Sequence, residues 1–485
     1  MLRAGLAPLR EAAAARSPVE RVRYHAVRWS LLALVAVATR LSFPPPAVGL
    51  ELSGPGAWII GPLLYDAALP GVFWLLLLFY RRETWDSLRE MSFFTGLFIL
   101  VIALSGLLQH AVPARPELIP ISFAAILVTV LYNGRLSVFA AVTLALVVGL
   151  QWELRDSPAL FFALASGLAG ALGIKGVRHR RESIRSIVVI AMVMALASLA
   201  VGLREGWSWL AIGDSVVAGA VLALGSVSVA MALLPVAESV TRRTTDLTLL
   251  ELGDPGAPLL RRLAAEAPGT WAHTLAVANL CESACDAIGA DALLARVGCY
   301  YHDIGKLERP ECFVENQGGG VNPHDALPPD ESARLIRQHV SAGLALATAQ
   351  GLPASVRAFI VEHHGTTRLE YFADRGSAPP GGDDSLYRYP GPRPQSAETA
   401  IAMLADAVEA SVRVLDQASP RRVRETIAHL VRQRIDSGEL SEAPLTLREL
   451  DRVTEVFARV MSGIHHARVE YPAERGGITA GFARG

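Results

Sequence analysis

The sequence predicts an all-α protein in which a polytopic transmembrane helix bundle is followed by a cytoplasmic helical domain. Two observations lead to this prediction. The 485-residue chain is 52% hydrophobic and only 19% charged, with a mean hydropathy of +0.35, and nearly all of the apolar excess lies before residue 240. After residue 240, charge and histidine concentrate and no strand-like alternation of any length occurs. A composition shift this sharp indicates at least two domains in different solvents.

Apolar segments long enough to cross a bilayer fill the first half of the chain. A spanning helix takes roughly 20 apolar residues. The candidate spans are 29–50, 57–80, 92–112, 118–133, 136–152, 158–174, 186–203 and 214–236. Several are short or contain a charge, as at Arg40 and Asp66, so the sequence leaves the number of spans at seven or eight.

The distribution of basic residues predicts the orientation of these spans. With the N-terminus inside, the inside segments hold seventeen Lys and Arg residues, whereas the outside segments hold four, namely Arg40, Arg115, Arg155 and Arg204. Cytoplasmic loops of membrane proteins carry such an excess of Lys and Arg. We therefore expect both ends of the chain to lie in the cytoplasm.

The membrane half offers little sign of a transport or sensing site. Its outside loops are too short to form a domain. Asp66 lies inside a span, where an ionisable residue is a functional candidate. No Lys or Arg chain or acidic relay is evident beside it, which favours a snorkelling or helix-packing carboxylate. The spans also lack the Gly/Pro-broken pair that marks a transporter's midplane site.

The pattern of charge and periodicity predicts five segments. These are a basic cytoplasmic N-terminus (1–28), a transmembrane domain (29–236), a linker helix (237–267), a helical domain (268–472) and a flexible tail (473–485). Thr270 is the expected N-cap of the first helix of the helical domain.

The cysteines and the net charge constrain the function only weakly. All four cysteines lie in the polar half without CxxC spacing, at Cys281, Cys285, Cys299 and Cys312. This arrangement favours free thiols in a reducing compartment over disulfides or zinc ligands. The net charge of −1 indicates no class of partner.

Seven polar side chains in apolar helical context predict a metal site. They are His273, His302, Asp303, His339, His363, His364 and Asp406. Each alone is explained as a satisfied core histidine or a helix-boundary aspartate, but together five of the twelve histidines would be buried independently. Buried polar groups without partners are costly, and a shared cation removes the cost for all of them. Imidazole and carboxylate suit borderline divalent metals, and the absence of thiolate argues against a closed structural zinc site.

Seven ligands are too many for one ion and fit two. Asp303 can bridge two ions with its two oxygens. Two ions roughly 3.5–4 Å apart hold and activate a water and clamp both oxygens of a phosphoryl displacement. Lys306, one turn past Asp303, would then meet a phosphate oxygen as a second catalytic residue, unless it is a solvated lysine.

The order His … His-Asp … His … His-His … Asp resembles the signature of the HD-domain metal-dependent phosphohydrolases. Longer segments strengthen this resemblance: EAPGTWAHTLAVANL, LLARVGCYYHDIGKLERPECFVENQ, NPHD, FIVEHHGTT, YRYPGPRPQSAETAIAMLADAVEASVR and HARVEYP. They are similar to the membrane-anchored seven-transmembrane HD proteins, densely over about residues 245–472 and in the membrane half only in layout.

The resemblance implies an activity and a location. Studied members of this family hydrolyse cyclic di-AMP, a second messenger, to the linear dinucleotide pApA. We therefore expect a multi-pass protein of the bacterial inner membrane whose HD phosphohydrolase domain, 268–472, degrades a cyclic dinucleotide in the cytoplasm. We expect no nucleic acid polymer as a partner, and a homodimer stays open. The alternatives are hydrolysis of another nucleotide, or a nucleotide-binding receptor without turnover.

The resemblance also implies a division of the ligands between two ions, iron or manganese. His273, His302, Asp303 and Asp406 would hold one ion. Asp303 would bridge to a second ion, which the remaining three ligands would hold. The chain departs from its relatives at Trp271 and Ala272, which could alter what the pocket accepts. It also lacks the extracellular domain that relatives insert after the first span, which puts ligand sensing in doubt.

Six residues are predicted to contact the substrate, namely Lys306, Asn322, His324, Tyr389, Arg393 and Arg413. Asn322 and His324 lie in a Gly/Pro-rich loop that would form either a substrate lid or a capped turn. Tyr389 and Arg393, in YRYPGPRP, would bind phosphate or a base, unless this segment is a rigid polyproline connector. Arg413 lies two turns after Asp406 and would face the same cleft.

Overall fold

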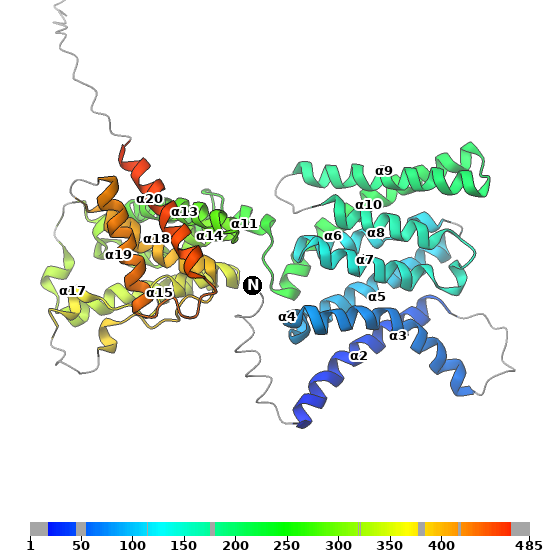
Figure 1. The fold of residues 1–485 in the computed structure, drawn as a ribbon, viewed down its shortest axis with the longest axis horizontal. Coiled ribbons are helices and arrows are strands. Elements are labelled where there is room, and N and C mark those ends of the chain that lie inside the picture. The colour runs from blue at the N-terminus through cyan, green and yellow to red at the C-terminus, as the bar shows by residue number, and fades with distance from the viewer. Residues whose placement is uncertain are drawn as a thin grey trace, which may run out of the picture. The chain divides into compact units, whose positions relative to one another are not determined.

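The computed structural model describes residues 18–44, 55–113, 115–174, 180–318, 320, 322–376, 384–415 and 419–466. The chain divides into two compact units, Met1–Leu250 and Glu251–Gly485, and each is described by itself (Figure 1). Apart from one isolated bridge between Arg368 and Arg388, the regular structure of the described residues is helical. The predicted all-α fold class is therefore confirmed.

The described residues of the first unit are mainly helical. Its elements are α2 (Pro18–Ser42), α3 (Pro55–Tyr80), α4 (Arg82–Asp86), α5 (Leu88–Ala111), η1 (Pro116–Leu118), α6 (Ile121–Leu131), α7 (Gly134–Gly149), η2 (Trp152–Leu154), α8 (Ala159–Gly173), α9 (Arg180–Glu205) and α10 (Trp209–Thr241). Each of the eight candidate spans overlaps one of the eight longer helices. Helix α11 (Asp246–Leu252) follows at the boundary between the two units.

Among the described residues of this unit, four helices are long and apolar enough to cross a membrane. They cover Ile60–Tyr80, Leu88–Ala111, Arg181–Glu205 and Trp209–Thr241. The segments Pro116–Leu131, Gly134–Gly149 and Ala159–Gly173 are apolar but shorter. Small residues let the shorter helices pack closely: a Cβ at Gly149 would lie 2.6 Å from Leu160 Cα, and one at Gly170 would lie 2.9 Å from Ser122 O. Such contacts are typical of helices packed inside a membrane.

Asp66 has a cationic partner in this unit. Arg40 Nη2 on α2 lies 2.5 Å from Asp66 Oδ2 on α3, and the Asp66 side chain is fully buried. Gln151 Nε2 donates a hydrogen bond to Asp66 Oδ1 at 3.3 Å. The expectation that no basic side chain accompanies Asp66 is therefore wrong, because the partner lies on another helix. The contact joins α2 and α3 to the end of α7.

The second unit holds the remaining helices. They are α12 (Pro258–Glu266), α13 (Pro268–Ile288), α14 (Ala292–Tyr301), η3 (Ile304–Glu308), η4 (Pro310–Cys312), η5 (Val314–Asn316), η6 (Pro323–Ala326), α15 (Pro329–Ala349), α16 (Ala354–Glu362), α17 (Glu370–Ala373), η7 (Ser385–Tyr387), α18 (Ala397–Arg413), α19 (Pro420–Asp436) and α20 (Leu447–His466). Helix α13 packs against α12, α14, α18 and α20, so it lies at the centre of the unit.

Local sequence explains where the central helices begin and end. Helix α13 starts at Pro268, whose missing N–H fits the first helical position, and it ends at Gly289 with φ +75°. Thr270 is therefore inside the first turn, and its prediction as the N-cap is wrong. Helix α18 starts with a capping box between Ser396 and Thr399.

Replacement of Asp66 by alanine should destabilise the first unit. Arg40 would lose its counter-charge in apolar surroundings, which costs roughly 3–5 kcal/mol, and the lower end applies because part of the Arg40 side chain is exposed. Thermal unfolding of the purified protein in detergent measures this. The double variant Arg40→Ala/Asp66→Ala should be more stable than Asp66→Ala alone. Wild-type melting of Asp66→Ala would contradict the structural role of the pair.

Candidate metal centre

The seven predicted ligands come from five segments of the second unit and meet in one place. His273 lies in the second turn of α13, His302 and Asp303 directly follow α14, and His339 lies within α15. The other three are His363 and His364, directly after α16, and Asp406 in α18. Ligand atoms within 4.8 Å of one another form three groups: His339, His363 and His364; His273, His302 and Asp406; and His302, Asp303 and His363.

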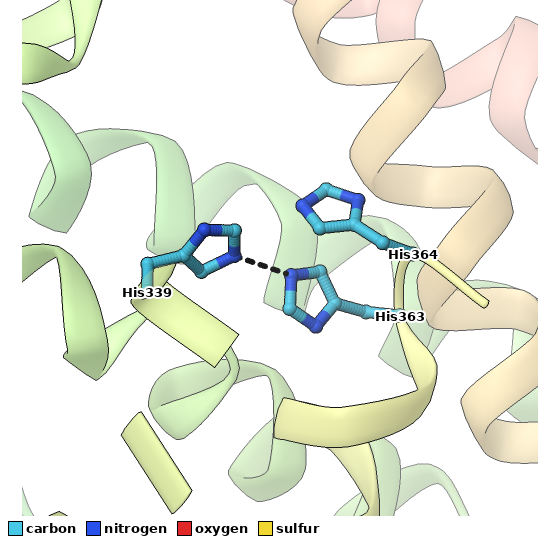
Figure 2. A group of neighbouring side chains, drawn as sticks. All are labelled: His339, His363 and His364. Atoms are coloured by element: carbon cyan, nitrogen blue, oxygen red, sulfur yellow. Dashed lines mark hydrogen bonds between the residues drawn. The ribbon is translucent and has the colours of Figure 1, made fainter. Parts of the chain in front are cut away.

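Figure 2 shows the first of these groups, with His339 facing the adjacent His363 and His364. His339 Nε2 lies 3.4 Å from His363 Nε2. His363 and His364 leave the end of α16 together, so one short segment supplies two of the three imidazoles.

Glycines let the backbone segments that carry the ligands approach closely. A Cβ at Gly305, two residues after Asp303, would lie 1.8 Å from the carbonyl oxygen of His339. A Cβ at Gly298 would lie 2.3 Å from the ring of Phe359 on α16. A larger residue at either position would push α15 or α16 away from the His302–Asp303 turn.

Three imidazoles are oriented by backbone carbonyl groups. Nδ1 of His302 lies 2.7 Å from Cys299 O, Nδ1 of His339 lies 2.6 Å from Ile336 O, and Nδ1 of His363 lies 2.9 Å from Phe359 O. A carbonyl only accepts, so each Nδ1 carries the proton and donates it. Each Nε2 therefore presents its lone pair to the cluster, as in metal-ligating histidines.

Glu409 orients the fourth imidazole. The Nδ1 of His273 is hydrogen-bonded to Glu409, which is buried, and its Nε2 lies 3.0 Å from Asp406 Oδ1. Glu409 was not predicted as a site residue. The signal was present, because Glu409 lies three residues after Asp406 and thus on the same face of α18.

Asp303 lies between two sets of imidazole nitrogens. Its Oδ2 is 3.3 Å from His302 Nε2 and 3.7 Å from His273 Nε2. Its Oδ1 is 3.6 Å from His339 Nε2 and 3.7 Å from His363 Nε2. Two ligands, each about 2.1 Å from a common metal ion, lie roughly 3.0–3.5 Å apart. The His302 contact lies within this range and the other three lie slightly beyond it, so a small inward shift of the side chains would let each Asp303 oxygen share an ion with a different pair of histidines.

Three buried atoms at the centre of the cluster have no hydrogen-bond partner among the described residues. These atoms are His302 Nε2 and the two carboxylate oxygens of Asp303, of which Oδ2 forms an ion pair with Lys306. Buried polar atoms almost always have a partner, so such exceptions require an explanation. Divalent cations beside the Asp303 carboxylate and the His302 ring explain these exceptions, and the donor set of imidazole and carboxylate fits such ions.

The protonation states of two of the ligands, His339 and His363, favour metal binding. Burial lowers the pKa of His363 to about 3, and it also lowers the pKa of His339. Both rings are therefore neutral at pH 7, the form that binds a metal. Burial lowers the pKa of His273 as well, but hydrogen bonds to Asp406 and Glu409 outweigh it and raise the pKa to about 10. A metal ion at His273 must displace that proton.

Lys306 is held between two carboxylates. Its Nζ lies 2.7 Å from Asp303 Oδ2 and 2.8 Å from Glu315 Oε1. Burial lowers the pKa of this amine, but the two carboxylates outweigh it and raise the pKa above its usual value. Lys306 therefore stays a cation and cannot act as a base at neutral pH. Glu315 was not predicted as a site residue, although it lies in the FVENQ segment that carries the family resemblance.

A cavity of about 210 Å³ opens onto the ligands. Its lining comprises His273, Lys306, Phe313, Val314, Glu315, Ile336, His339, His364, Tyr389, Asp406, Ala410 and Arg413. The Tyr389 ring stacks on His364, with 4.1 Å between ring centroids. Three of the six predicted substrate contacts, Lys306, Tyr389 and Arg413, therefore face this cavity.

The other three predicted contacts do not line this cavity. Asn322 Oδ1 accepts a hydrogen bond from His324 N at 3.1 Å, and the His324 ring lies 2.9 Å from Cys312 O. Arg393 Nη1 donates to Ser441 Oγ at 3.3 Å. Their roles in substrate binding stay predictions. Trp271 does not line the cavity either and packs against Tyr300.

The four cysteines are free, as the sequence predicts, and all four are buried. None of them belongs to a ligand group in the described part of the chain.

Comparison with known proteins identifies the family. Residues 59–245 match the model of the 7TM receptor with intracellular HD hydrolase, and residues 270–411 match that of the HD domain. The chain belongs to this family of membrane-anchored HD proteins. The family match and the apolar helices both indicate a membrane protein. Its HD domain contains groups of His and Asp residues that are suited to hold metal.

The chain is similar to two curated relatives. It is 33% identical over 421 residues to the cyclic-di-AMP phosphodiesterase PgpH of Bacillus subtilis, covering 83% of this chain and 59% of that protein. It is 30% identical over 417 residues to PgpH of Listeria monocytogenes, covering 83% and 57% respectively. The chain thus spans less than two thirds of the length of these relatives.

Crystal structures of the PgpH HD domain from L. monocytogenes are also similar to this chain. One of them is a complex with cyclic-di-AMP. Each is 39% identical, covering 44% of this chain and 100% of the solved chain, with a TM-score of 0.42.

Replacement of Glu409 by alanine should weaken metal binding while the fold is retained. The His273 ring would lose the carboxylate that fixes its orientation, and loss of such a partner lowers metal affinity roughly 10–100-fold. Titration of the purified protein with manganese measures the change. An affinity equal to that of the wild type would show that Glu409 does not orient a ligand.

Proposed function

We propose that this protein is a membrane-bound, metal-dependent phosphodiesterase that hydrolyses cyclic di-AMP to pApA and thereby controls the level of a second messenger. The observation that carries the proposal is the placement of Asp303, whose two oxygens face two different pairs of imidazole nitrogens at 3.3–3.7 Å. This arrangement supports a dinuclear site in which Asp303 would be the bridging carboxylate.

The residues fit two divalent ions, for which iron and manganese are the candidates. His273, His302, Asp303 and Asp406 would hold one ion. The second ion would be held by His339, His363 and His364, with Asp303 as the bridge. When bound, the ions supply an activated water and the positive charge that stabilises cleavage of a phosphate ester.

Lys306 supplies a further positive charge from the protein itself. It lines the cavity, and its ammonium stays protonated between Asp303 and Glu315. A fixed cation at the cavity wall orients a substrate phosphate and stabilises the negative charge that develops on it. Lys306 is therefore a candidate catalytic residue that binds and polarises phosphate without taking up a proton.

The cavity walls suit a nucleotide. Tyr389 and Phe313 provide aromatic surface, and Arg413 provides a cation at the opposite end of α18 from its capping box. Glu409 competes with a substrate phosphate for Arg413, because Arg413 Nε lies 3.8 Å from Glu409 Oε1. The cavity volume of 210 Å³ is below the roughly 300–1,000 Å³ of pockets that enclose a whole small molecule. We therefore expect the reacting phosphate to enter while part of a cyclic dinucleotide lies outside.

The choice of substrate rests on the relatives. Two relatives are cyclic-di-AMP phosphodiesterases, and a similar HD domain binds cyclic-di-AMP. Hydrolysis of another nucleotide is the nearest alternative. A receptor without turnover is disfavoured because the seven ligands lie together as a complete set. The excess of basic residues in the predicted inside loops supports a catalytic unit in the cytoplasm at the bacterial inner membrane.

Replacement of Asp303 by alanine should abolish hydrolysis and leave the helical fold, because neither half of the dinuclear site is then complete. The test incubates the purified protein with manganese and a panel of cyclic and linear nucleotides, and chromatography identifies the products. The wild type should convert cyclic di-AMP to pApA. The control Asp286→Ala, an exposed aspartate on α13, should behave like the wild type.

Two results would contradict parts of this proposal separately. Turnover by Asp303→Ala would contradict the bridged metal mechanism. Efficient cleavage of a different nucleotide, without cleavage of cyclic di-AMP, would contradict the substrate but leave the metal mechanism intact.

A further inference from the structure

We infer that Glu439, in the connection between α19 and α20, is a positioning residue for the metal centre: it holds the turn that carries His363 and His364. The inference rests on the proposed function only in that it takes these histidines as metal ligands. Glu439 is far from them in sequence and does not line the cavity.

Glu439 is a buried carboxylate, and both of its oxygens accept hydrogen bonds from the same residue, Thr366. Its residue exposure is 2%. Glu439 Oε2 accepts a hydrogen bond from Thr366 N at 2.9 Å, and Oε1 accepts one from Thr366 Oγ1 at 2.5 Å. Burial of a carboxylate is costly without such bonds, so Thr366 is strongly favoured at this position. Thr366 lies two residues after His364.

The backbone between the histidines and Thr366 fits closely against Glu439. Gly365 has φ +54°, a left-handed conformation that favours glycine, and a Cβ there would lie 2.3 Å from Glu439 Oε2. The turn therefore passes against the carboxylate with no room for a side chain. A movement of Glu439 would be transmitted to the residues that directly precede Gly365.

The hydrogen bonds between Glu439 and Thr366 also hold one wall of the cavity in place. Tyr389 N donates to Thr367 O at 3.0 Å, and Arg388 Nη1 donates to Thr366 O at 3.4 Å. These bonds align the segment after His364 with the segment that carries Tyr389. The Tyr389 ring then stacks on His364 with an angle of 27° between the ring planes.

His364 depends on this turn more than the other histidines do. His302, His339 and His363 each donate from Nδ1 to a backbone carbonyl at 2.9 Å or less. The described residues provide no such bond for His364, whose Nδ1 lies 3.6 Å from Asp406 Oδ2. That distance is too long for a hydrogen bond. The direction of the His364 ring is therefore set by its backbone and by the stacked Tyr389.

The helices on either side of Glu439 pack against the inner helices of the unit. Helix α19 packs against α18, and α20 packs against both α13 and α18. These two inner helices carry Asp406 and His273, which belong to one half of the centre, so the α19–α20 pair packs against the helices of that half. Through Glu439, the same helix pair reaches the His363–His364 turn on the other side.

The test measures metal stoichiometry and affinity in the full chain, purified in detergent. Manganese bound after equilibrium dialysis is counted for the wild type, Glu439→Ala, Glu439→Gln and Thr366→Val. The wild type should bind two ions. In Glu439→Ala the ion held by His339, His363 and His364 should bind at least about tenfold more weakly, as expected when a partner that orients a ligand is lost, while the other ion is unaffected.

The remaining variants separate positioning from general stability. Glu439→Gln keeps an acceptor for Thr366 N, and Thr366→Val keeps the backbone bond, so both should lie between wild type and Glu439→Ala. Asp436→Ala, an exposed carboxylate at the end of α19, is the matched control and should bind like the wild type. Thr366→Val decides the question if Glu439→Ala does not fold.

Two outcomes would overturn the inference. One is unchanged affinity for both ions in folded Glu439→Ala or Thr366→Val. The other is equal weakening of both ions, which indicates general destabilisation. Because the readout is bound metal, a wild type that binds two ions but does not cleave cyclic di-AMP would contradict the proposed substrate and leave the role of Glu439 standing.

Discussion

The arrangement of the helical unit depends on one buried carboxylate, Asp303, and on the need to compensate its charge. Asp303 is 1% exposed and sits where four other ligand-bearing segments converge. Lys306 neutralises part of this charge, but Lys306 also forms an ion pair with Glu315 and is shared between the two carboxylates. The proposed metal ions between Asp303 and the imidazoles would supply the rest of the compensating charge. The close approach of α15 at Gly305 follows from the same requirement, because His339 must reach Asp303.

The ends of helices do much of the work of orienting the ligands. The last carbonyl groups of a helix have no partner within the helix. Cys299 and Phe359 are in the last turns of α14 and α16, and their carbonyl oxygens accept the Nδ1 protons of His302 and His363. A histidine just past a helix end thus donates a hydrogen bond to a carbonyl group that has no partner within the helix. The same bond fixes which ring nitrogen carries the proton. His364, one residue further on, cannot use this arrangement and depends on more distant contacts.

The sequence predicted the helical fold, and the segments that carry the seven ligands, because apolar periodicity and residue type are local properties. It did not predict the partners that act across long stretches of chain. Glu409 bonds a ring 136 residues away, Glu439 bonds Thr366 across 73 residues, and Arg40 meets Asp66 across 26. Motif spacing also gives no side-chain direction, which is why Tyr389 faces the cavity while Arg393, four residues later, bonds Ser441.

The most direct test of the central claim is anomalous diffraction from crystals of the protein loaded with manganese. The account predicts two anomalous peaks on either side of Asp303, one among His273, His302 and Asp406 and the other among His339, His363 and His364. A single peak, or peaks that do not share Asp303, would contradict it.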